Sequence, residues 1–127
     1  VVDRNGDAVR SKGYIADDLT DKALEFIEKN RQKPFVCYIP YNTPHSPFQV
    51  PDNYYNRVKA RGIRQFSHNK AEEDPEVTVT ALAMCENIDD NVGRIMNKLQ
   101  ELKIAENTIV IYMTDNGPNS WRWNGDM

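Results

Sequence analysis

Two groups of residues have types and spacing suited to chemistry, and each follows an apolar run. Asp115 and Asn116 lie in Thr-Asp-Asn-Gly, directly after the run 109–113. A carboxylate and an amide oxygen suit a hard cation such as Ca²⁺ or Mg²⁺. The same tetrapeptide also suits an ordinary turn, so spacing alone leaves both interpretations open. Because Ca²⁺ takes about six to eight oxygens, further ligands would have to come from elsewhere.

The second candidate is His45, in the segment Tyr-Asn-Thr-Pro-His-Ser-Pro at 41–47, which follows the apolar run 35–39. The flanking prolines stiffen the backbone of this segment. An imidazole near neutrality can donate a proton or hydrogen-bond an anion. The alternative is an ordinary surface histidine, and the residues alone leave this choice open.

Other polar and aromatic residues give weaker indications. His68 lies in a polar stretch, which favours a surface position. Trp121, Arg122 and Trp123 form a group that could provide stacking surfaces and an anion contact. The two tryptophans could equally pack against other parts of a protein, and both interpretations stay open.

Composition excludes several classes of protein. The chain has 127 residues, a formal net charge of −3 and 28% charged residues, so no basic excess suggests nucleic acid. No apolar run approaches the roughly 18 residues that a membrane span needs. Cys37 and Cys85 form no Cys-x-x-Cys pair and lie in apolar patterns, which favours buried, unreactive thiols. No export signal is visible at the first residues.

Periodicity predicts the elements that position these candidates. Apolar residues at spacings of three and four predict a helix that begins near Asp17 and ends before Pro34, and a longer one over 77–102. The charges opposite the apolar face of the longer helix, among them Glu86 and Arg94, are interpreted as solvated surface. A short helix is expected near 52–57. The dipeptide Asn-Gly at 5–6 predicts a hairpin turn.

The apolar runs 35–39 and 109–113 are predicted to be buried strands. Buried strands separated by a long helix predict a parallel sheet with a right-handed crossover. Such a sheet would present His45 and Asp115 at the same edge, where open α/β sheets place their ligands. Two strands are fewer than the five or six that are typical. We therefore expect part of a larger α/β domain.

At these same residues the chain resembles arylsulfatase-type sulfatases of the alkaline phosphatase superfamily, particularly those that act on sulfated carbohydrates. The similarity is collinear and covers most of residues 13–117. It runs through 13–14, 19–21, 33–35, 41–45, 88–95, 106–110 and 114–117. The resemblance implies an alkaline-phosphatase-like α/β fold with a mostly parallel sheet flanked by helices.

The resemblance also implies roles for the candidate residues. Asp115 and Asn116 would contribute to a divalent cation site, usually Ca²⁺, with Mg²⁺ as the alternative. His45 would contact the sulfate group or assist the leaving oxygen. The implied partners are a sulfated small molecule or glycan and the rest of a parent catalytic domain. Export is common in this family and is implied only by the resemblance.

In this family the nucleophile is a formylglycine made from the Cys or Ser of C-x-P-S-R or S-x-P-S-R. Neither Cys37 nor Cys85 lies in such a motif, and no serine does. The Asp pair near the family's N-terminus is also unmatched, and the expected active-site Lys would fall beyond Met127. We therefore expect residues 1–127 to be an internal segment of a sulfatase catalytic domain, without the nucleophile region and inactive alone.

The predicted function is a segment of a sulfatase that hydrolyses sulfate monoesters of carbohydrates or aryl compounds. A phosphoester hydrolase or phosphomutase of the same superfamily would share the cation site but use Ser or Thr as the nucleophile. A binding or structural module without catalysis is the third alternative. Cooperative folding and binding of sulfated glycans by the isolated chain would favour that module.

Overall fold

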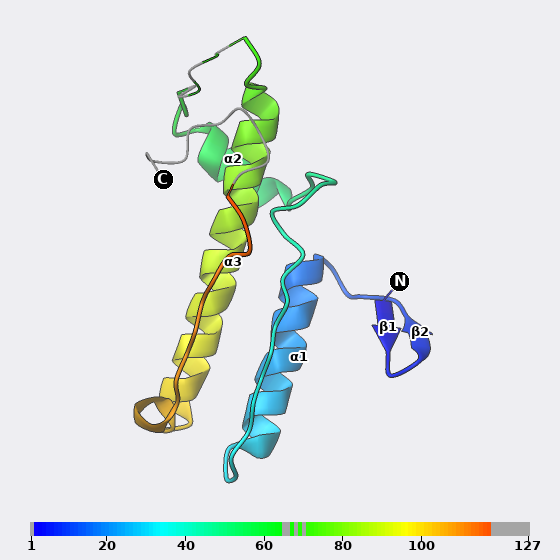
Figure 1. Cartoon of the computed structure of the whole chain (residues 1–127), viewed down its shortest axis with the longest axis vertical. Helices are drawn as coiled ribbons and strands as arrows, with labels where there is room; N and C mark the ends of the chain where they lie inside the picture. Colours follow the sequence, from blue (N-terminus) through cyan, green and yellow to red (C-terminus); the bar gives the residue numbers. More distant parts are fainter. Residues whose placement is uncertain (1, 65–66, 68, 70, 118–127) are drawn as a thin grey trace. The chain divides into compact units, whose positions relative to one another are not determined.

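The computed structural model describes residues 2–64, 67, 69 and 71–117 (Figure 1). Its elements are β1 (Val2–Arg4), β2 (Asp7–Val9), α1 (Ile15–Asn30), α2 (Asp52–Lys59), α3 (Pro75–Glu101) and the short 3₁₀ helix η1 (Ala105–Asn107). Its residues group into two compact units. The described part of the first unit is 2–43 with 87–108, and that of the second is 44–64, 67, 69 and 71–86 with 109–117.

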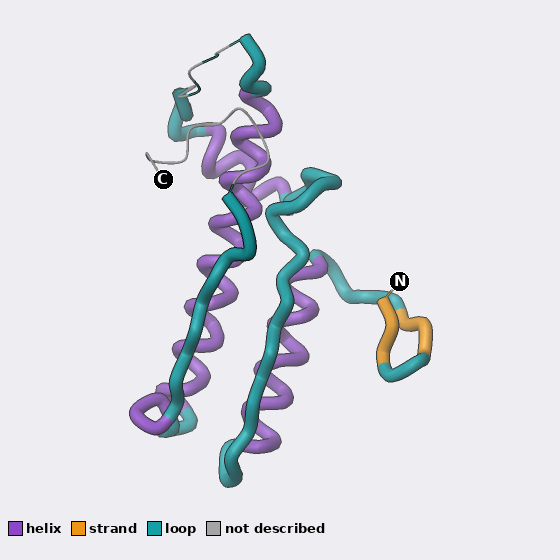
Figure 2. The backbone as a smooth tube through the Cα atoms, viewed as in Figure 1, coloured by secondary structure: helices purple, strands orange, loops and turns teal. Residues whose placement is uncertain are grey.

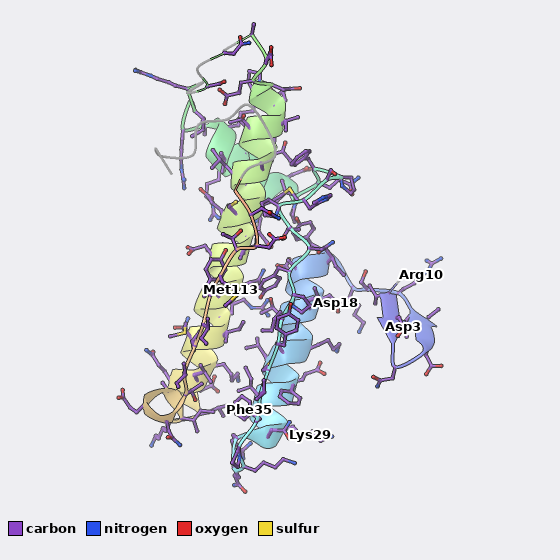
Figure 3. All side chains as sticks on the ribbon, in the orientation of Figure 1. Asp3, Arg10, Asp18, Lys29, Phe35 and Met113 are labelled. Atoms are coloured by element: carbon purple, nitrogen blue, oxygen red, sulfur yellow. The ribbon has the colours of Figure 1, made fainter. Side chains whose placement is uncertain are left out.

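The hairpin of β1 and β2 confirms the prediction from Asn5-Gly6. The strands pair antiparallel, with Asp3 opposite Ala8. Asn5 and Gly6 have φ angles of 56° and 94°, as a two-residue turn with positive φ at both central positions requires. The backbone N–H of Gly6 donates to Asp3 Oδ1 at 3.0 Å, which stabilises the turn. Asp3 is labelled in this hairpin in Figure 3.

Helix α1 matches the predicted helix, and its buried residues recur at the expected spacing. They are Ala16, Thr20, Ala23 and Ile27. The chain then turns back and runs alongside α1 as an extended segment (Figure 2). The rings of Phe26 and Phe35 meet edge to face with centroids 5.9 Å apart, so the start of this segment packs on α1.

The extended segment has a period of two in its exposure. Phe35, Cys37 and Ile39 are half-buried, whereas Val36 and Tyr38 are 89% and 84% exposed. Successive side chains of a strand point to opposite faces, so this backbone has the alternation of a strand. One face of the segment is covered and the other is open.

Local hydrogen bonds cap helix α3 at both ends. At its start, Asp74 Oδ1 accepts hydrogen bonds from the backbone N–H groups of Glu76 and Val77 at 2.9 and 3.3 Å, and Pro75 takes the first helical position. Such a cap satisfies N–H groups that have no partner within the helix, and proline loses nothing at that position. The predicted start near residue 77 is therefore correct to within two residues.

At the other end, Lys103 adopts a left-handed φ of 57°. Its N–H donates to the Gln100 carbonyl at 2.9 Å, and the N–H of Ile104 donates to the Leu99 carbonyl at 3.0 Å. This pair of bonds is the Schellman arrangement, here closed by a lysine in place of the usual glycine.

The second unit has its own small core between α2 and the first half of α3. Val58, Val79 and Ala83 are its buried residues. The partly buried residues around them are Val50, Tyr54, Tyr55, Ile63 and Leu82. Glu86 accepts a hydrogen bond from Arg57 Nε at 2.7 Å and also pairs with Arg61. The interpretation of Glu86 as a solvated charge is therefore wrong, because basic side chains of a neighbouring segment partner it.

The predicted parallel sheet is not observed: among the residues that the structure describes, β1 and β2 form the only sheet, and it is antiparallel. Residues 35–39 and 109–113 belong to no strand, and in the second run Ile109, Ile111 and Met113 are 89%, 72% and 76% exposed. The expectation that both runs are buried is wrong here. A strand needs a neighbouring backbone to pair with, and the described residues supply none to these runs.

Candidate functional site

His45 lies in an exposed loop of the second unit, directly before the cis Ser46–Pro47 peptide bond. Its ring nitrogen Nδ1 is 2.9 Å from the carbonyl oxygen of Ser46 and 3.3 Å from the Ser46 hydroxyl oxygen. Both contacts involve the same ring nitrogen. These contacts orient the imidazole relative to Ser46.

The two contacts correspond to different proton positions on the ring. When Nδ1 carries the proton, it donates to the Ser46 carbonyl, which is the shorter contact. When Nδ1 is unprotonated, it accepts from the Ser46 hydroxyl and Nε2 carries the proton. In both cases Nε2 takes no part in these contacts and is the nitrogen available to a ligand.

Asp115 and Asn116 lie in an exposed bend after the run 109–113. The hydroxyl of Thr114 donates to the backbone carbonyl of Asn116 at 2.8 Å, which closes the bend. The structure therefore confirms that the chain turns at these residues, as convergence of the two side chains on one ligand would require.

The donor set suits a hard cation only in part. The Asp115 carboxylate and the Asn116 amide provide oxygen ligands, and both residues are exposed. Across the described ranges of the chain, no cluster of three or more His, Cys, Asp or Glu side chains could hold a metal ion. These two residues would therefore form one part of a larger ligand set.

Nothing in the described residues brings the two candidates together, since no hydrogen bond or ion pair joins His45 to Asp115 or Asn116. Their predicted convergence at one edge of a sheet stays a prediction. His68, Trp121, Arg122 and Trp123 lie outside the described residues. The surface position expected for His68 stays a prediction, and the two alternatives for residues 121–123 stay open.

The cysteines differ from each other. Cys37 is half-buried, and burial raises the pKa of its thiol, in line with the prediction of an unreactive cysteine. Cys85 is exposed, so the expectation that it is buried is wrong. It lies on α3, where the nearby residues Ala83, Met84 and Asn87 are buried.

A buried polar network within the first unit is missing from the sequence-based predictions. The Nδ2 groups of Asn87 and Asn91 each donate to Asp17 Oδ1 at 2.8 Å, and the two asparagines are 0% and 1% exposed. Arg94 donates to Asn91 Oδ1 at 2.8 Å and pairs with Asp21. Arg94 is exposed, as predicted for this face of the helix, and its contacts also link α3 to α1.

A sequence signal for this network exists, although a weak one. Asn87 and Asn91 are four residues apart on the edge of an apolar helical face, and Asp17 and Asp21 have the same spacing on α1. Residues four apart lie on one side of a helix. Two such pairs of complementary type can meet, but the sequence does not say which helix meets which.

Tyr41, four residues before His45, is tied to α1. Its hydroxyl lies 2.6 Å from Thr20 Oγ1, and Thr20 is fully buried. Burial raises the pKa of Tyr41 above its ordinary value, so the hydroxyl stays protonated at neutral pH.

Comparison with known proteins gives a consistent result. A family model described as Sulfatase matches residues 2–123. The uncharacterized sulfatase YdeN of Escherichia coli (strain K12) is 32% identical over 118 residues, which are 90% of this chain and 19% of that protein. The N-acetylgalactosamine-6-O-sulfatase of Bacteroides thetaiotaomicron is 32% identical over 82% of this chain and 17% of that protein. The arylsulfatase of Hemicentrotus pulcherrimus is 31% identical over 79% of this chain and 15% of that protein.

The chain therefore spans about a fifth of the length of these relatives, or less. No solved structure matches it. Within the described residues, none of the helices has both the length and the apolar composition of a membrane-spanning segment.

Proposed function

Because the chain belongs to the sulfatase family, we propose that the full-length protein containing it hydrolyses sulfate monoesters. The observation that carries this proposal is the match of the family model to residues 2–123, nearly the whole chain. The chain provides one segment of the catalytic domain. The named relatives favour a sulfatase over a phosphoester hydrolase or a module without catalysis.

We propose a sulfated carbohydrate or an aryl sulfate as the substrate class. Two relatives bear names of this kind, the N-acetylgalactosamine-6-O-sulfatase of Bacteroides thetaiotaomicron and the arylsulfatase of Hemicentrotus pulcherrimus. Each is about 30% identical to the chain, so the reaction class transfers better than the identity of the sugar or aryl group.

We further propose that residues 35–39 and 109–113 are neighbouring strands of a mostly parallel sheet in the full-length protein. The alternation of exposed and half-buried side chains over 35–39 supports this assignment. So do the exposed apolar side chains of 109–113, because burial of each is worth about 1.5–3 kcal/mol. Strands from other parts of the protein would pair with both runs.

In that sheet the carboxyl ends of both runs meet at one edge, where Asp115, Asn116 and His45 follow. Asp115 and Asn116 would hold a divalent cation, Ca²⁺ or Mg²⁺, together with ligands from outside this chain. When bound, such a cation stabilises negative charge on the transferred group. The exposed carboxylate and amide oxygens fit this role chemically.

His45 would act on the substrate through Nε2, because Nδ1 is engaged by Ser46. In the imidazolium form, Nδ1–H donates to the Ser46 carbonyl and Nε2–H donates to a sulfate oxygen or to the ester oxygen. As the nucleophile bonds to sulfur, the bond between sulfur and the ester oxygen breaks, and the Nε2 proton is transferred to that oxygen. The alcohol is then released and the imidazole is left neutral. The Ser46 contacts keep the ring oriented during this change.

The nucleophile is not among the cysteines of this chain. Cys37 and Cys85 lie outside the sequence motif from which the family makes formylglycine. We propose that another part of the full-length protein supplies it.

The test is hydrolysis of p-nitrophenyl sulfate and p-nitrophenyl phosphate by the purified full-length protein, with kcat/KM measured for both. We expect the sulfate to be the better substrate, and an aldehyde mass shift in a Cys or Ser outside residues 1–127. Preference for the phosphate would favour the phosphoester hydrolase. Turnover of neither ester, with sulfated glycans bound, would favour the binding module.

A further inference from the structure

The hydrogen bond between Tyr41 and Thr20 has a defined direction. The Thr20 hydroxyl donates to the backbone carbonyl of Ala16 at 2.8 Å. A threonine hydroxyl has a single proton, so Thr20 Oγ1 can only accept from the Tyr41 hydroxyl, 2.6 Å away. Tyr41 is therefore the donor, and the bond exists only while Tyr41 is protonated.

Thr20 is a fixed acceptor because the buried polar network holds its helix on both sides. Asp17, three residues before Thr20, accepts hydrogen bonds from Asn87 and Asn91. Asp21, the next residue, pairs with Arg94. Thr20 itself is 0% exposed, so no water competes for its oxygen.

The Tyr41 hydroxyl holds the chain two residues before the extended segment ends. The alternation of half-buried and exposed residues begins at Phe35 and continues to Thr43. At Pro44 the chain enters the exposed loop that contains His45. Three residues separate Tyr41 from His45, and one of them is a proline of restricted φ.

On this basis, and resting on the proposed sulfatase function, we propose that Tyr41 is a positioning residue for His45. Its hydroxyl, donating to Thr20, fixes the starting point of the short segment that presents the imidazole. Tyr41 itself touches no substrate. Catalysis depends strongly on placement, since small displacements of a catalytic group lower the rate with little effect on substrate binding.

The chain offers a matched control for removal of this hydroxyl. The hydroxyl of Tyr14 is also buried within the first unit, but it has no hydrogen-bond partner among the described residues. Tyr41→Phe removes a hydroxyl that donates, and Tyr14→Phe removes one that does not. The two substitutions are otherwise chemically identical.

The experiment measures kcat and KM for aryl sulfate hydrolysis by the full-length protein. We expect Tyr41→Phe to lower kcat about fivefold with KM nearly unchanged, as loss of one hydrogen bond would predict. Thr20→Val should have the same effect, and the double variant should be no worse than either. Thr20→Ser, which keeps the acceptor, and Tyr14→Phe should retain the wild-type kcat.

A second background separates positioning from general stability. In His45→Ala, Tyr41→Phe should change the residual kcat by less than about twofold, because the group it positions is gone. An equal loss in both backgrounds would overturn the proposal, since a purely structural role affects both alike. Wild-type kcat in Tyr41→Phe would overturn it too.

A protein without sulfatase activity can be distinguished from one in which Tyr41 does not position His45. If the wild-type protein hydrolyses no sulfate ester, the readout becomes the NMR signals of the His45 ring, assigned with His45→Ala. A shift in Tyr41→Phe, absent in Tyr14→Phe, would support positioning without sulfatase activity. Unchanged signals in both variants would overturn the positioning role.

Discussion

Buried asparagine side chains in residues 87–101 of α3 hydrogen-bond to a half-buried aspartate of α1, whereas in residues 109–117 even the apolar side chains are exposed. Asn87 and Asn91 are almost fully buried and donate to Asp17. Ile109 and Met113, in contrast, are 89% and 76% exposed. Met113 is labelled in Figure 3.

The difference shows that residues of this chain provide the hydrogen-bond partners for its buried polar groups but do not bury the apolar side chains of residues 109–113. A buried amide without a partner costs about 1–3 kcal/mol, and here the partners come from within the first unit. Burial of an isoleucine side chain stabilises a fold by a similar amount, and the apolar side chains of residues 109–113 are not buried by the described part of the chain. The candidate ligands Asp115 and Asn116 directly follow this uncovered run. We propose that a cation site at these two residues needs ligands from segments outside this chain.

The largest effect is expected when a proposed cation ligand in the exposed residues 109–117 is removed. We expect Asp115→Ala in the full-length protein to lower both the bound Ca²⁺ and kcat/KM. The loss in kcat/KM should be about 100-fold or more, because residues that only support a metal ligand already contribute about tenfold to 100-fold. Metal analysis and kinetics check this. The control is Asp89→Ala, an exposed aspartate of α3, which should keep both values. Unchanged metal content in Asp115→Ala would contradict the ligand assignment.

Removal of the imidazole tests the other candidate residue. We expect His45→Ala to lower kcat about 100-fold, the size usual for loss of a general acid, while the cation content stays at the wild-type value. Steady-state kinetics and metal analysis of the same sample measure both. His68→Ala should have wild-type kinetics. Wild-type turnover in His45→Ala would decide against its role.

Disruption of the buried polar network should lower the free energy of unfolding. Asp17→Ala leaves two buried asparagine amides without their shared acceptor, so we expect the free energy of unfolding to fall by about 1–3 kcal/mol. The matched change Asp18→Ala should cost less than about 0.5 kcal/mol. Denaturant unfolding of the full-length protein measures both. Equal effects of the two changes would show that the network adds nothing to stability.

The smallest effect concerns Glu76 of the second unit and its two hydrogen-bond partners. The hydrogen bond from the Tyr55 hydroxyl, followed by that from Lys59, lowers the pKa of Glu76. Because the pKa of Glu76 is lower in the folded state, its ionised carboxylate stabilises the fold at pH values above the unfolded-state pKa near 4.5. This stabilisation is lost as the pH falls through the folded-state pKa. Glu76→Gln should therefore lower Tm slightly at pH 7 and by less as the pH drops below about 4.5. A Tm difference that is independent of pH would contradict this cause.

The helices could be predicted from the sequence because their signals are local. Apolar spacing gave α1 and α3 to within about two residues, and the hairpin followed from Asn5-Gly6. The cap at Asp74 and Pro75 is also local, and it sets the start of α3.

The strands and the buried network could not be predicted with the same success, because both depend on partners distant in the sequence. The runs 35–39 and 109–113 have strand composition but no partner strand in the described residues. Asp17 and Asn87 are 70 residues apart, and no local pattern pairs them. At the candidate site, residue types indicated His45, Asp115 and Asn116, whereas the donor role of Tyr41 became visible only from the bond between Thr20 and Ala16.

A crystal structure of the full-length protein with Ca²⁺ and sulfate would show directly whether Asp115, Asn116 and His45 share one site. We expect Asp115 and Asn116 oxygens about 2.3–2.6 Å from one cation, with His45 Nε2 within hydrogen-bond distance of a sulfate oxygen beside it. A cation and a sulfate bound together elsewhere, with Asp115 and His45 both in solvent, would contradict it.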